Sequence, residues 1–415
     1  MTVDTADPQA IAAGFDLAAL GPAFLDDPYP TYHALRAHDP VHRMPDGSVF
    51  LSRYADCLAV YRDRRMLSDK TREFGPKYGV GSPLYRHHTT SLVFNDPPLH
   101  TRVRSLLMPA FTPRALTDLR PKLEALVDRL LDRIADKREF DLIADLAAAV
   151  PVQVIGDLLA IPMTDRGPLR DWSLAILGAL EPRLTDEQMA RGNRAVADFT
   201  GYLDGLIAER RRNLVLDGSD VLSTLIAGDP GADVSGGDAL SPDELAQNCI
   251  FLLNAGHETT TNLIGNGVAA LMEHPDQYAR LRDDPGLING AVEEFLRYES
   301  SNQLGNRRVG ERLELAGVTL EAGTYVHIGI GAANRDPAVF PDPDRLDVDR
   351  TPNKHLAFGS GAHACAGMSL ARMEGRVAIG RLVRRFPRLE RAGDYVRGGR
   401  ARFRGFLSYP MLASG

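Results

Sequence analysis

The chain has 415 residues, of which 44% are hydrophobic and 25% charged, and its formal net charge is −7 at pH 7. This composition is typical of a soluble globular protein with ample core, and the acidic balance argues against nucleic acid as the main partner. The sequence contains no run of about 18 apolar residues, so it predicts no membrane span.

The N-terminus lacks the basic region followed by an apolar one that marks a signal peptide. Three scattered cysteines, Cys57, Cys249 and Cys365, argue against a disulfide framework. Since unpaired cysteines are usual in a reducing compartment, we expect a cytoplasmic protein.

The N-terminal elements are expected to be short. Residues 28–40 predict a helix, residues 41–52 a hairpin with Asp46 and Gly47 at its turn, and residues 54–62 another helix. Residues 69–98 are rich in glycine and proline and predict a long loop. Such a loop is either a binding loop or lid, or a flexible surface insertion.

The middle of the chain is expected to be mostly helical. Apolar residues at helical spacing predict helices over 99–108, 113–135, 142–160, 165–179, 186–212 and 219–227. Residues 229–240 are rich in Gly, Asp and Pro and predict a flexible connector between two halves. After Arg307 the pattern changes, and residues 318–320 and 325–328 predict short strands. The sequence therefore predicts a mainly α fold with small β-sheets.

One predicted helix is much longer than the others. Ser241 can cap it, Pro242 suits its first position and Glu244 can close a capping box. The pattern continues to His274, a length of about 48 Å at the usual rise. Such a helix can cross a whole domain.

The middle of this helix holds an unusual segment. Ala255 and Gly256 leave room for a small ligand such as dioxygen. Thr259 can donate a hydrogen bond back to the carbonyl of Ala255 and open the helix locally. Glu258 places a carboxyl group beside that opening. The alternative is an ordinary core helix with a threonine on its inner face.

Residues 358–367 place a single cysteine in a glycine-rich loop before a helix predicted from Met368 to about Phe386. A helix N-terminus favours the thiolate form of a cysteine. No second cysteine or histidine lies at zinc-binding spacing. A lone thiolate in a close-fitting loop suits a metal whose other ligands come from a cofactor, and haem iron meets that description. The alternative is a buried free cysteine at a turn.

The residues of this loop follow a recognisable sequence motif. The fixed positions of the motif Phe-Gly-x-Gly-x-His-x-Cys-x-Gly are Phe358, Gly359, Gly361, His363, Cys365 and Gly367. This motif resembles the haem-binding signature of the cytochrome P450 family. Residues 255–259 resemble the oxygen-activation segment of the same family, with Glu258 where bacterial members more often have aspartate. With further motifs in the expected order, the resemblance extends from about His100 to Leu370.

The resemblance implies the triangular, mostly helical P450 fold with a long central helix over the haem, as one haem-thiolate monooxygenase domain over residues 1–415. It implies haem b bound through iron to Cys365, with no bound flavin or iron–sulfur cluster. Thr259 would hold the activated oxygen and its water, and Glu258 would be the proton gate. Glu294 and Arg297, at helical spacing where they can pair, would form with Arg345 a buried group for folding and haem retention.

Further residues are implied to bind the cofactor. The two haem propionates need cationic or hydrogen-bonding partners. The resemblance gives this role to His100, Arg104, His363 and Arg307, with Arg308 as a competitor of Arg307. The remaining haem contacts would come from Ala255, Gly256, Phe358, Gly359 and Gly367.

The substrate pocket is implied to draw on the 69–94 segment, the segment around 403–407, and residues of two further segments. These residues are Phe251, Asn254, Ala255, Asn302, Gln303, Leu304 and Gly305. The polar Asn254, Asn302 and Gln303 either bind an oxygenated substrate or face water and backbone. The basic residues Lys70, Arg72, Arg86, His87 and His88 would favour an anionic substrate.

The function implied is a monooxygenase that activates dioxygen with two electrons and inserts one oxygen atom into a small organic substrate, by hydroxylation or oxidative demethylation. A non-catalytic haem gas sensor or carrier and a peroxide-driven enzyme are the alternatives, and neither needs the acid–threonine pair. The chain ends about 50 residues after Cys365, so electrons from NAD(P)H would arrive through a separate ferredoxin and its flavin-dependent reductase. Arg102, Arg372 and Arg376 would form a basic docking patch near the thiolate, unless they only solvate helices or bind the propionates.

Overall fold

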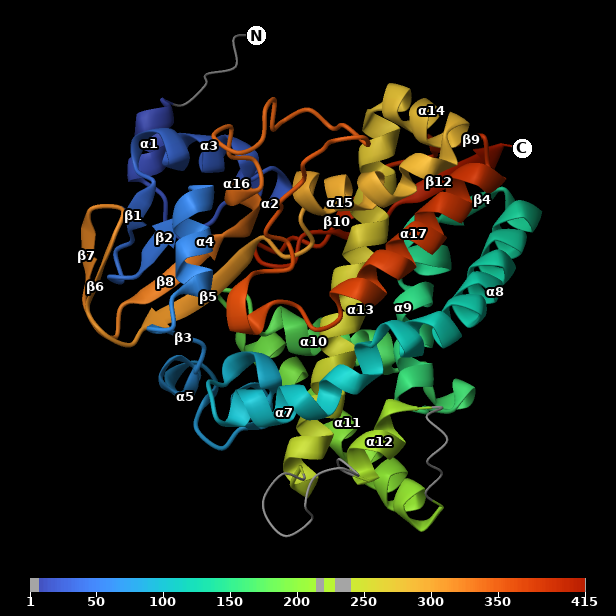
Figure 1. Cartoon of the computed structure of the whole chain (residues 1–415), viewed down its shortest axis with the longest axis horizontal. Helices are drawn as coiled ribbons and strands as arrows, with labels where there is room; N and C mark the ends of the chain where they lie inside the picture. Colours follow the sequence, from blue (N-terminus) through green and yellow to red (C-terminus); the bar gives the residue numbers. More distant parts are fainter. Residues whose placement is uncertain (1–6, 214–219, 228–239, 415) are drawn as a thin grey trace.

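The computed structural model describes residues 7–213, 220–227 and 240–414. Helices fill most of the molecule, and the largest β-sheet lies along one side (Figure 1). The predicted connector at 229–240 lies outside the described residues, apart from Leu240. No helix of the described part is both long and apolar enough to cross a membrane.

The N-terminal predictions are confirmed. After α1 (Pro8–Ala13) and α2 (Pro22–Asp26) come α3 (Tyr29–His38), β1 (Val41–Arg43), β2 (Val49–Leu51) and α4 (Tyr54–Arg62). The β1 and β2 strands pair antiparallel. Gly47, in the turn between them, has a φ of 83°, a left-handed conformation that favours glycine.

Strands from both ends of the chain build a five-stranded sheet in the order β1-β2-β8-β5-β3. Its other members are β3 (Met66–Leu67), β5 (Leu304–Val309) and β8 (Tyr325–Gly329). The predicted strand at 318–320 is β7 (Val318–Leu320), which pairs with β6 (Leu313–Leu315) in a separate hairpin. The sheet brings β5 next to the N-terminal region, where it forms one wall of the site described below.

The prediction of a long loop over 69–98 is wrong. The segment contains α5 (Thr71–Tyr78), α6 (Pro83–Thr90) and a 3₁₀ turn (Leu92–Phe94). Gly79 ends α5 with a φ of 80°, and the Ser82 hydroxyl accepts a hydrogen bond from the Tyr85 amide at the start of α6. Glycine and proline here mark helix ends rather than one continuous loop.

The predicted middle helices are present with small changes of boundary. They are α7 (Leu99–Leu107), α8 (Pro113–Lys137), α9 (Ala149–Leu158), α10 (Leu169–Gly178), α11 (Asp186–Arg212) and α12 (Val221–Ala227). A π-helical turn (Leu142–Ala147) separates β4 (Glu139–Asp141) from α9, so the single helix predicted over 142–160 is divided.

The long predicted helix is α13 (Pro242–Glu273), which runs through the middle of the molecule (Figure 1). Its N-terminus has the predicted capping box between Ser241 and Glu244. The C-terminal elements are α14 (Pro275–Asp283), α15 (Ile288–Tyr298), α16 (Ile330–Ala333), α17 (Met368–Arg385), β9 (Arg388–Arg391), β10 (Val396–Arg397), β11 (Phe406–Ser408) and β12 (Pro410–Ser414).

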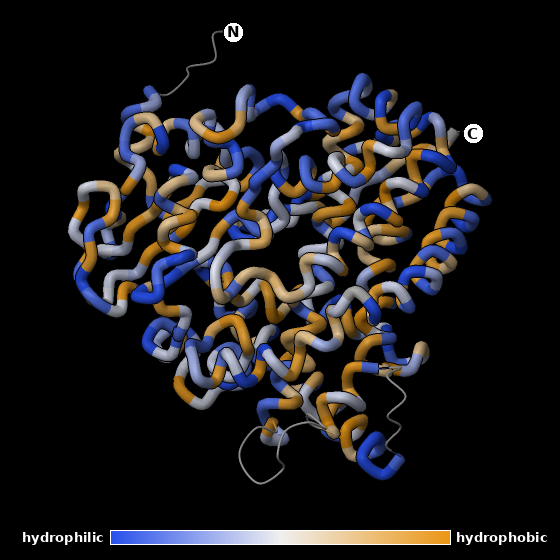
Figure 2. Tube along the Cα trace, in the orientation of Figure 1, coloured by the Kyte–Doolittle hydropathy of each residue, from blue (hydrophilic) through white to orange (hydrophobic). Residues whose placement is uncertain are grey.

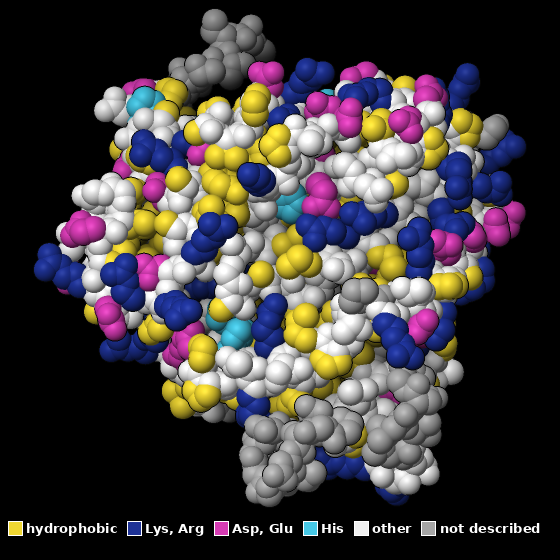
Figure 3. Space-filling model, viewed as in Figure 1, with side chains coloured by type: hydrophobic (Ala, Val, Ile, Leu, Met, Phe, Trp, Pro, Cys, Tyr) yellow, Lys and Arg dark blue, Asp and Glu magenta, His cyan; other side chains and the backbone are white. Residues whose placement is uncertain are grey.

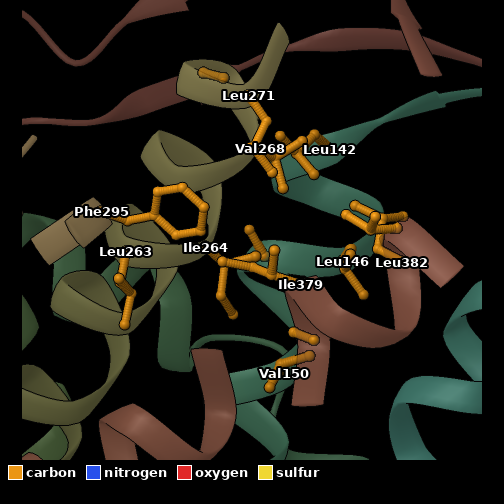
Figure 4. Close-up of a cluster of buried hydrophobic side chains, with 14 of the residues drawn as sticks. Leu142, Leu146, Val150, Leu263, Ile264, Val268, Leu271, Phe295, Ile379 and Leu382 are labelled. Atoms are coloured by element: carbon orange, nitrogen blue, oxygen red, sulfur yellow. The ribbon is translucent and has the colours of Figure 1, made fainter. Parts of the chain in front are cut away.

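The largest core cluster holds α13 against α15, α17 and the segment before α9. Figure 4 shows Leu263 and Ile264 of α13 near Phe295 of α15 and Ile379 of α17. Along the chain trace, hydrophobic residues concentrate in this interior, whereas outer helices such as α8 alternate between hydrophilic and hydrophobic residues (Figure 2). This packing fixes α13 relative to α17, and hence relative to the cysteine loop that precedes α17.

Candidate functional site

A cavity of about 320 Å³ lies between the middle of α13 and the loop before α17. The α7 helix, strand β5 and the end of α6 also contribute to its wall. Cys365, Thr259, His100, Arg104 and Arg307 all line it, although they are widely separated in the sequence. The structure therefore brings most of the predicted site residues to one place.

The cysteine loop has a tightly determined backbone. Gly359 and Gly361 have φ values of 65° and 72°, and a side chain at Gly361 would collide with the Tyr61 carbonyl oxygen. The Cys365 amide donates to the Phe358 carbonyl at 2.9 Å, which closes the loop. Burial raises the pKa of the Cys365 thiol, while the Gly367 amide and the Arg104 and Arg372 guanidinium groups act to lower it.

The predicted small-residue segment of α13 faces the cavity through Ala255, Gly256 and Thr259. The Thr259 hydroxyl donates to the Ala255 carbonyl oxygen at 2.7 Å, as predicted. The helix stays continuous around this bond, so the local opening expected from it is not seen. Thr259 nevertheless presents a hydroxyl group on the wall of the same cavity that Cys365 lines.

Glu258 lies outside this cavity. Its Oε1 accepts a hydrogen bond from Arg400 Nη1 at 2.5 Å, and its buried Oε2 has no hydrogen-bond partner among the described residues. Burial raises the pKa of Glu258 to about 7, although Arg400 lowers it. The carboxyl group can therefore hold or release a proton near neutral pH, one residue from Thr259.

Four cationic or imidazole side chains line another part of the cavity: His100, Arg104, Arg307 and His363. The His100 and His363 rings lie 3.9 Å apart by centroid, and burial with the nearby Arg307 lowers the pKa of His363 to about 3. The buried Nε2 of His100 has no hydrogen-bond partner within the part of the chain that the structure describes. Neutral imidazoles and guanidinium groups together can bind two carboxylates.

Arg308 does not compete for this role, since its Nη2 lies 3.2 Å from Asp69 Oδ1 and its Nε 3.8 Å from Glu73 Oε1. A thiol, an imidazole nitrogen without a partner among the described residues and a set of carboxylate-binding groups around one cavity fit a haem, whose iron Cys365 would bind and whose two propionates the other groups would hold. Phe358, Gly359 and Gly367 also line the cavity.

The predicted Glu294–Arg297 pair is present and fully buried, with Arg297 Nε 2.7 Å from Glu294 Oε2. The prediction of Arg345 as its third member is wrong. Arg345 contributes only its backbone carbonyl, to Arg297 Nη2, and Arg350 Nε instead donates to Glu294 Oε1 at 3.1 Å. Both arginines lie in the same irregular segment, and nothing in their spacing distinguishes them.

Of the predicted pocket residues, Phe251, Asn254, Ala255, Asn302, Leu304 and Gly305 line the cavity. Gln303 does not, which corrects the prediction. Its Nε2 donates to the Ser300 carbonyl at 2.8 Å, and its Oε1 lies against Gly331. This hydrogen bond and the contact with Gly331 hold the Gln303 side chain away from the cavity that its neighbours Asn302 and Leu304 line.

The sequence predicts that basic residues of the 69–94 segment favour an anionic substrate. This prediction is wrong for the buried side chains of the segment. Burial lowers the pKa of Lys70 to about 7 and that of His87 to about 4. Burial also lowers the pKa of His88 well below its usual value. His87 and His88, which line the cavity, are therefore neutral at pH 7 and do not favour an anionic substrate.

Glu374 of α17 is a cavity-lining residue that the sequence interpretation missed. It is 2% exposed, and burial raises its pKa to about 8 despite a hydrogen bond with Thr260. Its position within an amphipathic helix gave no signal, because a glutamate there is usually a solvent-exposed residue.

The predicted docking arginines contact carboxylates. Arg372 Nε lies 2.7 Å from Glu293 Oε1, and Arg376 Nη2 lies 3.7 Å from the same oxygen. Arg102 pairs with Glu244. Positive and negative side chains are mixed over the face on which α17 lies (Figure 3). The patch formed by Arg102, Arg372 and Arg376 therefore carries less net positive charge than the sequence alone indicates.

Comparison with known proteins gives consistent similarities. The family model described as cytochrome P450 matches residues 175–285 and 286–393. The chain is 41% identical over 370 residues to Vitamin D(3) 25-hydroxylase of Pseudonocardia autotrophica, covering 88% of each chain. It is 40% identical over 381 residues to cytochrome P450 monooxygenase PikC of Streptomyces venezuelae, covering 90% of this chain and 87% of the relative.

The solved structure of P450BioI in complex with hexadec-9Z-enoic acid ligated acyl carrier protein has a TM-score of 0.88 and 34% identity, over 95% of this chain and 100% of that one. The fold, the cysteine loop and the similarities over most of the chain agree. The chain belongs to the cytochrome P450 family, the haem-thiolate monooxygenases.

Proposed function

We propose that this protein, as one domain in the cytoplasm, uses haem b to insert one oxygen atom from dioxygen into a small, mainly apolar organic substrate. The two electrons come from NAD(P)H through a flavin-dependent reductase and a ferredoxin, and the reaction is a hydroxylation or an oxidative demethylation. The observation that carries the proposal is the single cavity lined by both Cys365 and the Ala255–Thr259 segment.

The residues of the site form two groups, one that would hold the haem and one that would supply protons. When bound, the haem supplies an iron centre that activates dioxygen. Cys365 would be the protein ligand of that iron and donate electron density to it. His100, Arg104, Arg307 and His363 would hold the propionates by hydrogen bonds and charge.

The α13 segment supports oxygenation over gas sensing. Thr259 presents its hydroxyl to the cavity, and Glu258, buried with a pKa of about 7, can pass a proton toward it. A sensor or carrier has no use for a proton supply at this position. Arg400, which donates to Glu258, also lines a second pocket together with Glu181 and Arg183.

The substrate would lie among the apolar side chains of Leu177, Leu180, Phe251 and Ile155. Two relatives whose names describe their reactions, Vitamin D(3) 25-hydroxylase and 6-deoxyerythronolide B hydroxylase, support hydroxylation. The test is turnover of a compound panel with NADH, ferredoxin, reductase and isotopically labelled dioxygen. We expect a product with one labelled oxygen atom, and label-free product would contradict the proposal.

Thr259→Ala should leave substrate affinity nearly unchanged but lower the product formed per NADH by about a hundredfold, the usual contribution of a positioned proton-transfer group. The hydroxyl bonds to the Ala255 carbonyl and lines the cavity, so its loss removes a proton donor without reshaping the pocket. The electrons should then reduce dioxygen to hydrogen peroxide. The peroxide formed is measured together with the NADH oxidised. The matched control is Thr261→Ala, whose hydroxyl donates to the His257 carbonyl in the same way and which does not line the cavity. Equal coupling in the two variants would contradict the role of Thr259.

Glu258→Gln should slow turnover by about tenfold to a hundredfold, since the amide cannot release a proton. The native rate should fall as pH rises through about 7, where Glu258 loses its proton. In Glu258→Gln, the rate should no longer fall as pH rises through about 7. A wild-type rate with an unchanged profile would remove Glu258 from the proton path.

The ferredoxin should dock over the cysteine loop near Arg372 and Arg376. The double charge reversal Arg372→Glu with Arg376→Glu should slow the first electron transfer and reverse its dependence on ionic strength, because salt then screens a repulsion instead of an attraction. Arg194→Glu, an exposed position on α11, is the control. Equal rates in all three proteins would exclude this face, and unchanged haem spectra would show that the variants are intact.

A further inference from the structure

Arg402 is a cavity-lining cation that the sequence interpretation did not single out. It lies between β10 and β11, one residue before the segment predicted to contribute to the substrate pocket. Its backbone is held from two sides, because its amide donates to Glu181 Oε1 at 3.2 Å and its carbonyl accepts from the Gln303 amide at 2.8 Å. The side chain therefore starts from a fixed position on the wall.

The guanidinium group of Arg402 pairs with no carboxylate among the residues that the structure describes. Its Nη1 donates to the Leu304 carbonyl oxygen at 2.9 Å. When the Asn306 amide is turned to match the donors around it, its oxygen accepts from Arg402 Nη2 at 2.9 Å. Both partners are neutral, so they orient the guanidinium group without neutralising its charge.

The charges on the cavity wall do not balance. Arg104, Arg307 and Arg402 line it, and none of the three forms an ion pair within the described part of the chain. Burial keeps the lining histidines neutral at pH 7 and raises the pKa of Glu374 to about 8, so this carboxyl is mainly protonated. The porphyrin and the Cys365 thiolate would balance a ferric iron, which leaves two propionates for three arginines.

Position indicates which arginine is left over. Burial lowers the pKa of His363 to about 3, and the charges of Arg307 and Arg104 contribute to this shift. These two arginines therefore belong with the histidines predicted to hold the propionates. The charge of Arg402 acts instead on Lys77 of α5, whose pKa is lowered to about 7 by burial and then by Arg402. Arg402 thus lies beside α5.

We propose that the substrate carries a carboxylate on an otherwise apolar body, and that Arg402 binds this carboxylate. A guanidinium partner offsets the cost of taking a carboxylate out of water. Leu177, Leu180 and Phe251 would surround the apolar body. The positive charge comes from Arg402 and not from the neutral histidines of the 69–94 segment. The proposal rests on the proposed function, because it names the substrate class of the same site.

Calorimetry of ligand binding to the haem-loaded protein at about pH 7 tests this without turnover. The probes are dodecanoate and adamantanecarboxylate, each compared with its methyl ester. At least one carboxylate should bind about tenfold to a hundredfold tighter than its ester, the usual gain from a hydrogen bond to a charged group. Arg402→Gln should lower this ratio to one or below, because an unpaired carboxylate is costly to bury. Ratios near one, or no binding, for both pairs in the native protein would overturn the proposal.

Two further variants separate a direct contact from a general effect of charge. Arg402→Lys keeps the charge but loses the planar fork, and should retain part of the preference. Arg86→Gln removes an arginine of α6 that pairs with Asp243 and does not line the cavity, and should retain all of it. A ratio kept in Arg402→Gln, or lost equally in Arg86→Gln, would also overturn the proposal.

The rival carboxylate is a haem propionate, and the rate of haem transfer to an excess of apomyoglobin distinguishes the two sources. Arg402→Gln should release haem at the native rate, whereas Arg307→Gln should release it faster. Haem loss from Arg402→Gln as fast as from Arg307→Gln would assign Arg402 to the propionates and overturn the proposal. A native protein without a thiolate-type haem spectrum would contradict the proposed function instead, so the two failures are distinguishable.

Discussion

Cys365→Ser is expected to reduce substrate-dependent oxygen insertion to background. The alcohol of serine is not ionised at neutral pH and cannot donate electron density to iron as a thiolate does. The loop itself should keep its fold, because its closure depends on the Cys365 backbone amide and on the left-handed Gly359 and Gly361. The measurement is product formed per haem with NADH and redox partners.

The two other cysteines supply the controls. Cys249 lies in an apolar core cluster, where burial raises its thiol pKa to about 12. Cys57 is also buried, and its Sγ lies 3.5 Å from the Leu51 carbonyl oxygen. Cys249→Ala and Cys57→Ala should keep full activity per haem. Oxygen insertion by Cys365→Ser at a rate close to these controls would contradict the assignment.

Arg297→Met should destabilise the fold by about 3–5 kcal/mol, the usual cost of leaving one member of a buried ion pair alone. Arg297 and Glu294 are both 0% exposed in their side chains. Arg297 also donates to the carbonyl oxygens of Asn334 and Pro343, which would lose their partner. Urea unfolding monitored by circular dichroism gives the free energy, and haem content should fall with it.

Matched arginines make this prediction specific. Arg280→Met removes a half-exposed pair with Asp347 and should cost at most about 1 kcal/mol. Arg350→Met should cost more than Arg345→Met, because only the side chain of Arg350 reaches Glu294. A larger effect at Arg345, or equal effects at Arg297 and Arg280, would contradict this account of the buried group.

Local signals predicted much of the fold and the site. The capping box at Ser241 and the apolar periodicity of α13 are properties of neighbouring residues, so the sequence is enough to find them. The cysteine loop is equally local, since its glycines adopt left-handed conformations within one turn. The loop predicted at 69–98 failed because glycine and proline mark helix ends as well as loops.

The remaining features depend on contacts between distant segments. Arg350 replaces Arg345 because the fold of the irregular segment decides which side chain reaches Glu294. Glu374 lines the cavity only through the packing of α17 beside α13. Asn254 contacts His87, and no spacing rule connects residues so far apart in the sequence. Ion pairs such as that of Arg372 with Glu293 likewise require the tertiary structure.

The absorption spectrum of the reduced, carbon-monoxide-bound protein tests the central claim most directly. The haem-loaded native chain should show the long-wavelength band of a thiolate-ligated haem, because Cys365 is the only one of the three cysteines that lines the cavity. Cys365→His should bind haem but shift this band to the position of an imidazole-ligated haem. A native chain without the thiolate band, or a Cys365→His variant that keeps it, would contradict the assignment.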